Sequence, residues 1–76
     1  MKIEDFISAI EEEFEDLEPG VLTPDVKFRE VMEFNSINAV IIIALVDAEF
    51  DVTINAEDLQ SSKTINDLFK IIKSRV

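Results

Sequence analysis

The chain lacks several side chains on which protein chemistry commonly depends. Its 76 residues contain no cysteine, histidine, tyrosine or tryptophan, and only one glycine and two prolines. Without cysteine there is no disulfide, and without cysteine or histidine there is no site for a soft metal ion. A serine nucleophile activated by histidine is excluded for the same reason. The sequence therefore predicts a protein that is not an enzyme and holds no metal.

Basic side chains are also few. Seven Lys and Arg against 17 Asp and Glu give a formal net charge of -10 at pH 7. Eight of the acids lie within residues 1–18, whereas residues 62–76 hold four bases and one acid. We expect no nucleic acid and no anionic membrane as a partner, because Lys and Arg supply the affinity for both. A basic protein surface is the natural partner, although a merely well-solvated acidic domain has the same charge.

Long apolar runs are absent as well. Residues 39–46 are eight consecutive apolar residues, whereas a helix needs about 20 to cross a bilayer. The first residues are acidic and amphipathic, without the basic start and continuous apolar core of a signal peptide. We therefore expect a cytoplasmic protein without membrane insertion, folded as a single domain over residues 1–76.

A periodic pattern of apolar residues predicts the first helix. Apolar side chains recur at intervals of three and four from Ile3 to Leu17, which corresponds to one stripe of an α-helix. Acidic residues occupy the opposite side of this helix. We expect Pro19–Gly20 to end it, because proline disfavours helix in the residue before it.

A long connection follows over residues 19–34. It carries many apolar residues, among them Phe28 and Met32, which we expect to anchor it on the helices. A short helical turn can follow Pro24, with Asp25 in its first turn. A connection of this length in so small a domain often has a functional role.

The second long helix is predicted from about Ser36 to Phe50. Asn35 or Ser36 can cap it, because a short side-chain oxygen accepts from a free backbone N–H two or three residues on. The segment is rich in β-branched residues, which also favour a buried strand. Its length decides for a helix. A helix that is apolar nearly all round is either central in the core or presents one side to a partner.

Two shorter patterns predict the remaining helices. Asn55 can cap a short helix that ends near Gln60. Thr64 and Asp67 form the pattern of a capping box at the start of the last helix. The sequence thus predicts an all-α fold, a small four-helix bundle with three longer helices, a short third helix and a long loop between the first two. The residues of the last helix expected to point inward are Ile65, Leu68, Phe69 and Ile72.

The order of these elements and the residues around Ser36 resemble the acyl carrier protein family over essentially the whole chain. In that family the serine of an Asp-Ser-Leu motif receives a 4′-phosphopantetheine arm through a phosphodiester, and the thiol of the arm carries an acyl group as a thioester. The resemblance implies this covalent cofactor on Ser36, with Asn35 and Ile37 framing it for a phosphopantetheinyl transferase. The likeness is carried by Phe34-Asn35-Ser36-Ile37, Glu49-Phe50-Asp51 and Thr64-Ile65-Asn66-Asp67-Leu68.

The chain departs from the family pattern beside the serine. Asn35 replaces the usual Asp, and Ile37 replaces the usual Leu. Asn38 and Ile41 stand where family members commonly have acids that meet basic patches on partner enzymes. The resemblance therefore implies a divergent, specialised carrier whose partners are the transferase and acyl-processing enzymes. Its predicted partner-binding residues are Asn38, Ile41, Ala44, Asp47 and Ala48.

Two functions fit these residues. The first is a monomeric, non-enzymatic acyl carrier of the kind used in fatty acid biosynthesis and lipid metabolism. Its cargo can be a fatty acyl, polyketide, aminoacyl or other thioester. In the second, Ser36 is an ordinary helix cap, and the unmodified chain binds a partner or its own copy through the apolar helix. Ile41 is then either a core residue or a docking residue. The inner helix faces expected to shelter a cargo include Val40, Leu45, Ile54, Leu59, Leu68 and Ile72.

Overall fold

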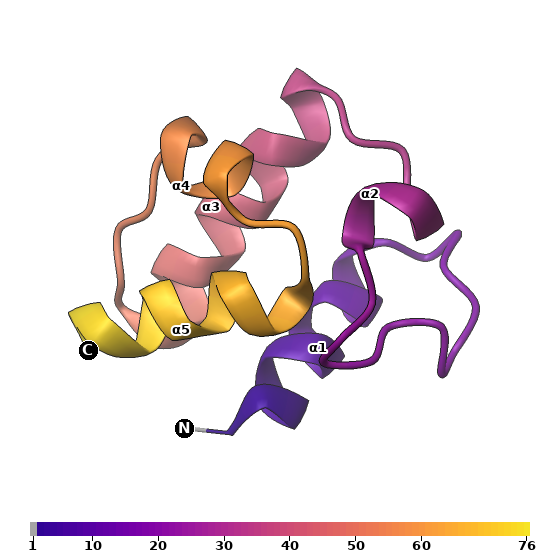
Figure 1. The fold of residues 1–76 in the computed structure, drawn as a ribbon, viewed down its shortest axis with the longest axis horizontal. Coiled ribbons are helices and arrows are strands. Elements are labelled where there is room, and N and C mark those ends of the chain that lie inside the picture. The colour runs from indigo at the N-terminus through magenta and orange to yellow at the C-terminus, as the bar shows by residue number, and fades with distance from the viewer. Residues whose placement is uncertain (1) are drawn as a thin grey trace.

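The computed structural model describes residues 2–76, which fold into five α-helices (Figure 1). α3 and α5 each contact both α1 and α4, so α1 and α4 are joined through α3 and α5. The predicted all-α bundle is confirmed, with three longer helices, a short helix near the C-terminal end and a further short helix in the long connection. The helices are α1 (Ile3–Glu13), α2 (Phe28–Val31), α3 (Ser36–Phe50), α4 (Ala56–Ser61) and α5 (Ile65–Arg75).

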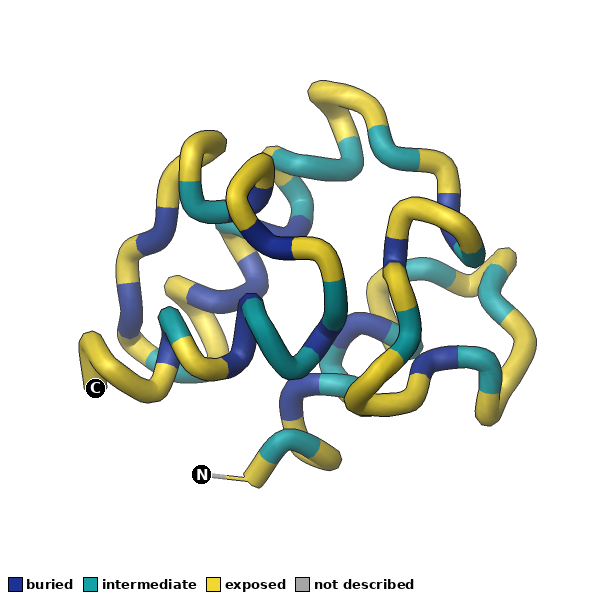
Figure 2. The backbone as a smooth tube through the Cα atoms, viewed as in Figure 1, coloured by how far each residue is buried: buried dark blue, intermediate teal, exposed yellow. Residues whose placement is uncertain are grey.

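One continuous apolar core holds the helices together, and the exposed residues surround it (Figure 2). Phe6 of α1 is fully buried at its centre. Its ring centroid lies 6.0 Å from that of Phe50 in α3, in an edge-on arrangement, and 6.2 Å from that of Phe69 in α5. Aromatic pairs at these distances stabilise a fold by more than the burial of their apolar area alone contributes. The inward residues predicted for the last helix are all buried, namely Ile65, Leu68, Phe69 and Ile72.

α1 is shorter than the apolar pattern predicts. It ends at Glu13 rather than near Leu17, and Phe14 leaves the helix with φ -111° and ψ 83°. The last turn contains acids and no basic residue, and the negative end of a helix dipole disfavours acids. Phe14 and Leu17 nevertheless pack against the core. The periodicity therefore predicts their burial correctly and the end of the helix wrongly.

The long connection is fastened to α5. Pro24–Asp25 form a turn, and the short helix expected there begins only at Phe28. Two backbone N–H groups at the start of α5 donate to the carbonyls of Pro24 and Val26, at 2.8 and 3.2 Å. The first N–H groups of a helix lack partners within it, so this turn satisfies them instead of starting a helix itself. Phe28 and Met32 are buried, as expected for anchors of the connection.

The start and end of α3 match the prediction, and the segment is a helix rather than a strand. Asp51 ends it in a left-handed conformation, with φ 56°. The capping residues predicted for α4 and α5, Asn55 and Thr64, both accept a hydrogen bond from the backbone of their helix. Within residues 2–76 we find no helix with the length and apolar character to cross a membrane.

Candidate functional site

Ser36 is the first residue of α3 and is exposed. The residue before it, Asn35, has extended backbone (φ -129°, ψ 179°) and is the N-cap. Its side-chain oxygen Oδ1 accepts a hydrogen bond from the backbone N–H of Asn38 at 2.8 Å. Of the two residues that could cap this helix, Asn35 does so. The interpretation of Ser36 as an ordinary cap is therefore wrong, and its hydroxyl is not needed to begin the helix.

The start of α3 suits a negatively charged group on Ser36. The first N–H groups of a helix have no partner within it. The side chain of Asn35 accepts from that of Asn38, and its backbone carbonyl accepts the first bond within the helix, from the N–H of Ala39 at 2.9 Å. The N–H groups of Ser36 and Ile37 lie at the positive end of the helix dipole, where a phosphate is stabilised. The first turn of α3 contains no acid to oppose it.

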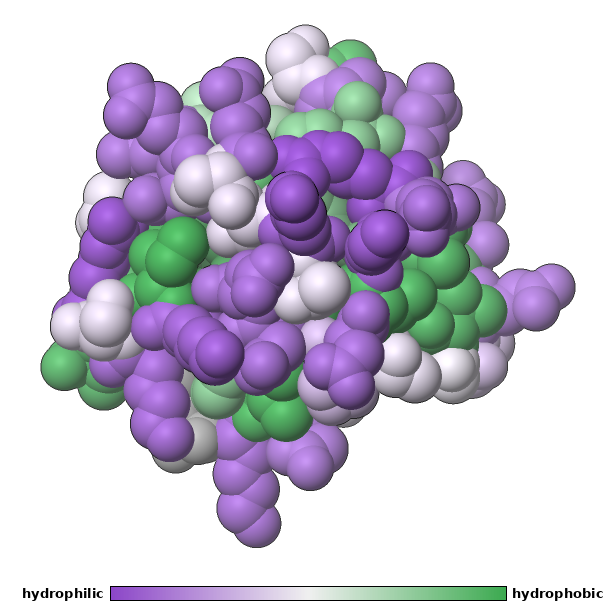
Figure 3. All heavy atoms as spheres, viewed as in Figure 1, coloured by the Kyte–Doolittle hydropathy of each residue, from purple (hydrophilic) through white to green (hydrophobic). Residues whose placement is uncertain are grey.

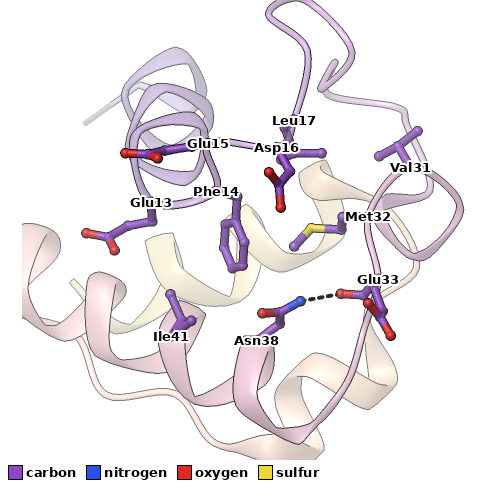
Figure 4. Close-up of a pocket in the computed structure, with 10 residues that line it drawn as sticks. All are labelled: Glu13, Phe14, Glu15, Asp16, Leu17, Val31, Met32, Glu33, Asn38 and Ile41. Carbon is purple, nitrogen blue, oxygen red and sulfur yellow. Dashed lines mark hydrogen bonds between the residues drawn. The ribbon is translucent and has the colours of Figure 1, made fainter.

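Asn38 fastens the preceding loop to α3. Its side-chain nitrogen Nδ2 donates to the backbone carbonyl of Glu33 at 2.6 Å (Figure 4). Together with the Asn35 cap, this bond holds residues 33–38 in one arrangement around Ser36. The sequence predicts Asn38 only as a partner-binding residue and gives no sign of this contact, because the asparagine and the carbonyl are five residues apart and follow no capping pattern.

A groove lies beside Ser36, between α3 and α4. Its volume is about 400 Å³. Most of its walls are apolar, so it can receive an apolar group close to the hydroxyl. Besides Asn35 and Ser36 it is lined by Phe34, Ala39, Val40, Ile43, Ala56, Leu59 and Gln60.

Val40 does not lie on the inner face of α3, contrary to the prediction. It was predicted to point inward, yet 64% of it is exposed, and it lines the groove from outside the core. Each residue advances about 100° around a helix, and the core contacts of Ile42, Leu45 and Val46 turn Val40 toward solvent. The other residues expected on the inner faces are buried in the core, namely Leu45, Ile54, Leu59, Leu68 and Ile72.

A second cavity, of about 550 Å³, lies between the end of α1 and α3 (Figure 4). Apolar side chains such as Phe14, Met32 and Ile41 line it. Ile41 is half-buried, so it is neither a core residue nor a fully exposed one. Four acids give the cavity a strongly negative rim, namely Glu13, Glu15, Asp16 and Glu33.

An apolar ridge runs along the outside of α3 from the site. Ile37 and Val40 are 70% and 64% exposed, and with Ser36 and Ile41 they line a shallow depression of about 330 Å³. Such exposure contrasts with the largely hydrophilic surface of the face drawn in Figure 3. Of the predicted partner-binding residues, Asn38 and Ile41 are half-buried, and Ala44, Asp47 and Ala48 are exposed on α3. Val40, three residues after Ile37, lies on this exposed side of α3 and not on the inner face.

The two carboxyl groups with a lowered pKa belong to helix caps. A side-chain hydrogen bond from Arg75 chiefly holds the pKa of Asp58 below its ordinary value of 3.8. The backbone N–H groups of Thr64 and Lys63 likewise lower the pKa of Asp67. Both carboxylates complete capping boxes, at α4 and α5, so neither marks a catalytic group at Ser36. Across residues 2–76, no group of three or more potential ligands is arranged to hold a metal ion.

Comparison with known proteins adds one finding. The model of a family described as a phosphopantetheine attachment site matches residues 5–72. A search of curated proteins and a search of solved structures found no match.

Proposed function

Because the chain belongs to the family of phosphopantetheine attachment domains that includes the acyl carrier proteins, we propose that it is an acyl carrier whose arm is attached to Ser36. Members of this family are the site of covalent 4′-phosphopantetheine attachment. When bound, the group supplies a thiol that carries the cargo as a thioester. The observation that carries the proposal is the exposed hydroxyl of Ser36 at the start of α3, beside a cap supplied by Asn35.

Each residue near the hydroxyl has a defined part in this proposal. The Ser36 oxygen attacks the phosphorus of the donor and forms the phosphoester bond, while the bond from that phosphorus to the rest of the donor breaks and the remainder leaves with the electron pair. Since the chain contains no histidine, the base that removes the hydroxyl proton belongs to the transferase. The backbone N–H groups of Ser36 and Ile37 stabilise the phosphate. The groove walls formed by Val40 and Ile43 exclude water from an apolar cargo.

We further propose that partner enzymes bind along the outer side of α3. Ile37 and Val40 offer exposed apolar area next to the attachment point, and Asp47 is the acid on the predicted face. An exposed apolar patch beside a functional residue is typical of a protein interaction site. A second copy of this chain is disfavoured as the partner, because two molecules of net charge -10 repel each other. We therefore expect a monomer.

Mass spectrometry of the intact protein tests the attachment. The full chain, incubated with a broad-specificity phosphopantetheinyl transferase and its donor, is expected to gain the mass of one arm. Ser36→Ala should gain none. Ser8→Ala, which alters another exposed serine, is the matched control and should be modified like the wild type. A wild type that stays unmodified, or a Ser36→Ala variant that gains the arm, would contradict the proposal.

A charge on the ridge tests partner binding. Val40→Glu is expected to raise the transferase KM for the carrier by roughly tenfold, because binding would bury the new carboxylate without a partner. Its melting temperature should change little, since the side chain is 64% exposed. Val76→Glu, at the 75% exposed C-terminal valine, is the control and should leave KM unchanged. An unchanged KM for Val40→Glu would place the docking surface elsewhere.

The second candidate function, an unmodified interaction module, makes a different prediction about the same ridge. An unmodified interaction module would bind its own copy through α3, and sedimentation would then detect a dimer that Ile41→Glu dissociates. A monomer at high protein concentration would count against that function and agree with the carrier.

A further inference from the structure

The two arginines of the chain hold the two ends of the short helix α4. Near its start, Nη1 and Nη2 of Arg75 donate to the two oxygens of the Asp58 carboxylate, at 2.5 and 2.9 Å. At its end, Arg29 of α2 donates from Nη1 to the carbonyl of Ser62 at 2.6 Å and from Nη2 to that of Leu59 at 2.5 Å. The last carbonyls of a helix lack partners within it, and its negative end attracts a cation.

Arg29 also contacts two aromatic rings. The centre of its guanidinium lies 5.0 Å from the ring centroid of Phe28 and 4.8 Å from that of Phe34. The two ring centroids are themselves 5.7 Å apart. Cation–π contacts of this kind stabilise both partners. Phe28 is buried in the core, and Phe34 is half-buried two residues before Ser36. One side chain thus joins α4, the core anchor of α2 and the segment that leads to the attachment point.

Two of the residues that Arg29 contacts, Phe34 and Leu59, line the groove beside Ser36 from different elements. Phe34 lines it from the segment before α3, and Leu59 lines it from α4. The guanidinium therefore bridges these walls, because it contacts the Phe34 ring and hydrogen bonds to the Leu59 carbonyl.

We propose that Arg29 is a positioning residue for Ser36. It holds the segment 33–35 against α4, so that the hydroxyl and the groove are presented in one arrangement to the attaching enzyme. This inference rests on the proposed role of Ser36. A planar guanidinium can donate to two carbonyls while it stacks on a ring, whereas an ammonium cannot reproduce that geometry. Without Arg29, only a fraction of molecules has the competent arrangement, and the apparent KM rises by the reciprocal of that fraction.

Transferase kinetics on the full chain test this role. Arg29→Met is expected to raise the KM for the carrier about tenfold, equivalent to about 1.4 kcal/mol, with kcat unchanged. Arg29→Lys should remain impaired, because charge alone does not replace the two hydrogen bonds. Arg75→Met is the matched control, since the hydrogen bonds of Arg75 go to Thr53 and Asp58 near the start of α4, and its KM should rise less than that of Arg29→Met. All variants are measured well below their melting temperatures.

Hydrogen exchange on the unmodified protein tests the same role independently of the arm. Backbone amides of residues 33–37 and 59–63 should exchange faster in Arg29→Met and Arg29→Lys than in wild type or Arg75→Met, with α1 unchanged. If the wild type accepts no arm, the role of Ser36 fails, while this exchange pattern still decides whether Arg29 holds the segment. Unchanged exchange and KM in Arg29→Met, wild-type behaviour of Arg29→Lys, or an equal effect of Arg75→Met would each overturn the inference.

Discussion

Asn35 separates two tasks that meet at the start of α3. A helix start needs a side-chain oxygen for its free N–H groups, and attachment needs an accessible hydroxyl. If Ser36 were the cap, its oxygen would be bonded to the backbone. Asn35 supplies the capping oxygen to the N–H of Asn38 instead, and Ser36 stays exposed one position later. The neutral amide retains the cap of the Asp that is usual in this family without its charge.

We expect Asn35→Ala to lower the free energy of unfolding by about 1 kcal/mol, because the cap is lost. Asn35→Asp should keep the cap and add a negative charge at the positive end of the helix. Its free energy of unfolding should therefore be at least that of the wild type, and at most about 1 kcal/mol higher. Urea denaturation monitored by circular dichroism measures both. Equal stability of Asn35→Ala and wild type would show that the hydrogen bond contributes nothing.

At the scale of the elements, α4 is short and is bonded at both ends. It has six residues, Ala56–Ser61, and isolated helices of that length are unstable in water. Its capping box joins Asn55 and Asp58, and the two arginines bind at its two ends. One of its residues, Leu59, is fully buried in the core. The groove beside Ser36 therefore has one wall whose stability comes from side-chain bonds more than from helix length.

The Asp58 carboxylate makes this wall sensitive to acid. Its folded-state pKa lies below 3.8, chiefly because of the hydrogen bond from Arg75. A carboxylate whose pKa is lowered on folding contributes stability above its unfolded pKa and loses it as pH falls through the folded pKa. The urea midpoint should therefore fall more between pH 5 and pH 3 in the wild type than in Asp58→Asn. Glu57→Gln, next to it on the same helix, is the control and should follow the wild type. Parallel pH profiles for wild type and Asp58→Asn would contradict this role.

At the scale of the whole molecule, the dominant feature is charge. A net charge of -10 is carried by a body of 28 × 25 × 20 Å. Most of the acids before α2 lie on α1 and the turns that follow it, and three of them, together with Glu33, line the cavity between α1 and α3. Self-repulsion of this kind destabilises the compact state and keeps molecules apart. It also makes a basic partner surface favourable beside the apolar ridge.

We expect added salt to stabilise the fold. At about 0.01 M salt the screening length is about 30 Å, comparable with the molecule, whereas at 1 M it is about 3 Å. The melting temperature should rise by several degrees when NaCl is raised from about 10 mM to about 500 mM. The double variant Glu12→Lys/Glu15→Lys changes the net charge from -10 by +4 to -6 and should show a smaller rise. A melting temperature that falls with salt, or an equal rise in the variant, would exclude self-repulsion as the cause.

The sequence by itself determined the parts of this protein that depend on neighbours three or four residues apart. The ends of α3, the capping residues Asn55 and Thr64, and the buried side of α5 follow from periodicity and capping patterns, which leave both Asn35 and Ser36 open as the cap of α3. Ser36 is predicted as the attachment point from the resemblance of the whole chain to the acyl carrier protein family, because a serine at a helix start by itself indicates no more than a cap.

Only the tertiary structure decided how those parts meet. It ended α1 at Glu13, turned Val40 toward solvent and moved the short helix of the connection to Phe28. The exposure of Val40 and the place of the short helix depend on contacts with segments distant in the chain, whereas the acids in the last turn of α1 also disfavour its continuation. Arg29 is the clearest case, because the carbonyls it binds belong to residues 30 and 33 positions later. No periodicity encodes such a pairing. The pairing of Arg29 with these carbonyls forms only when the packing of the core brings α2 and the end of α4 together.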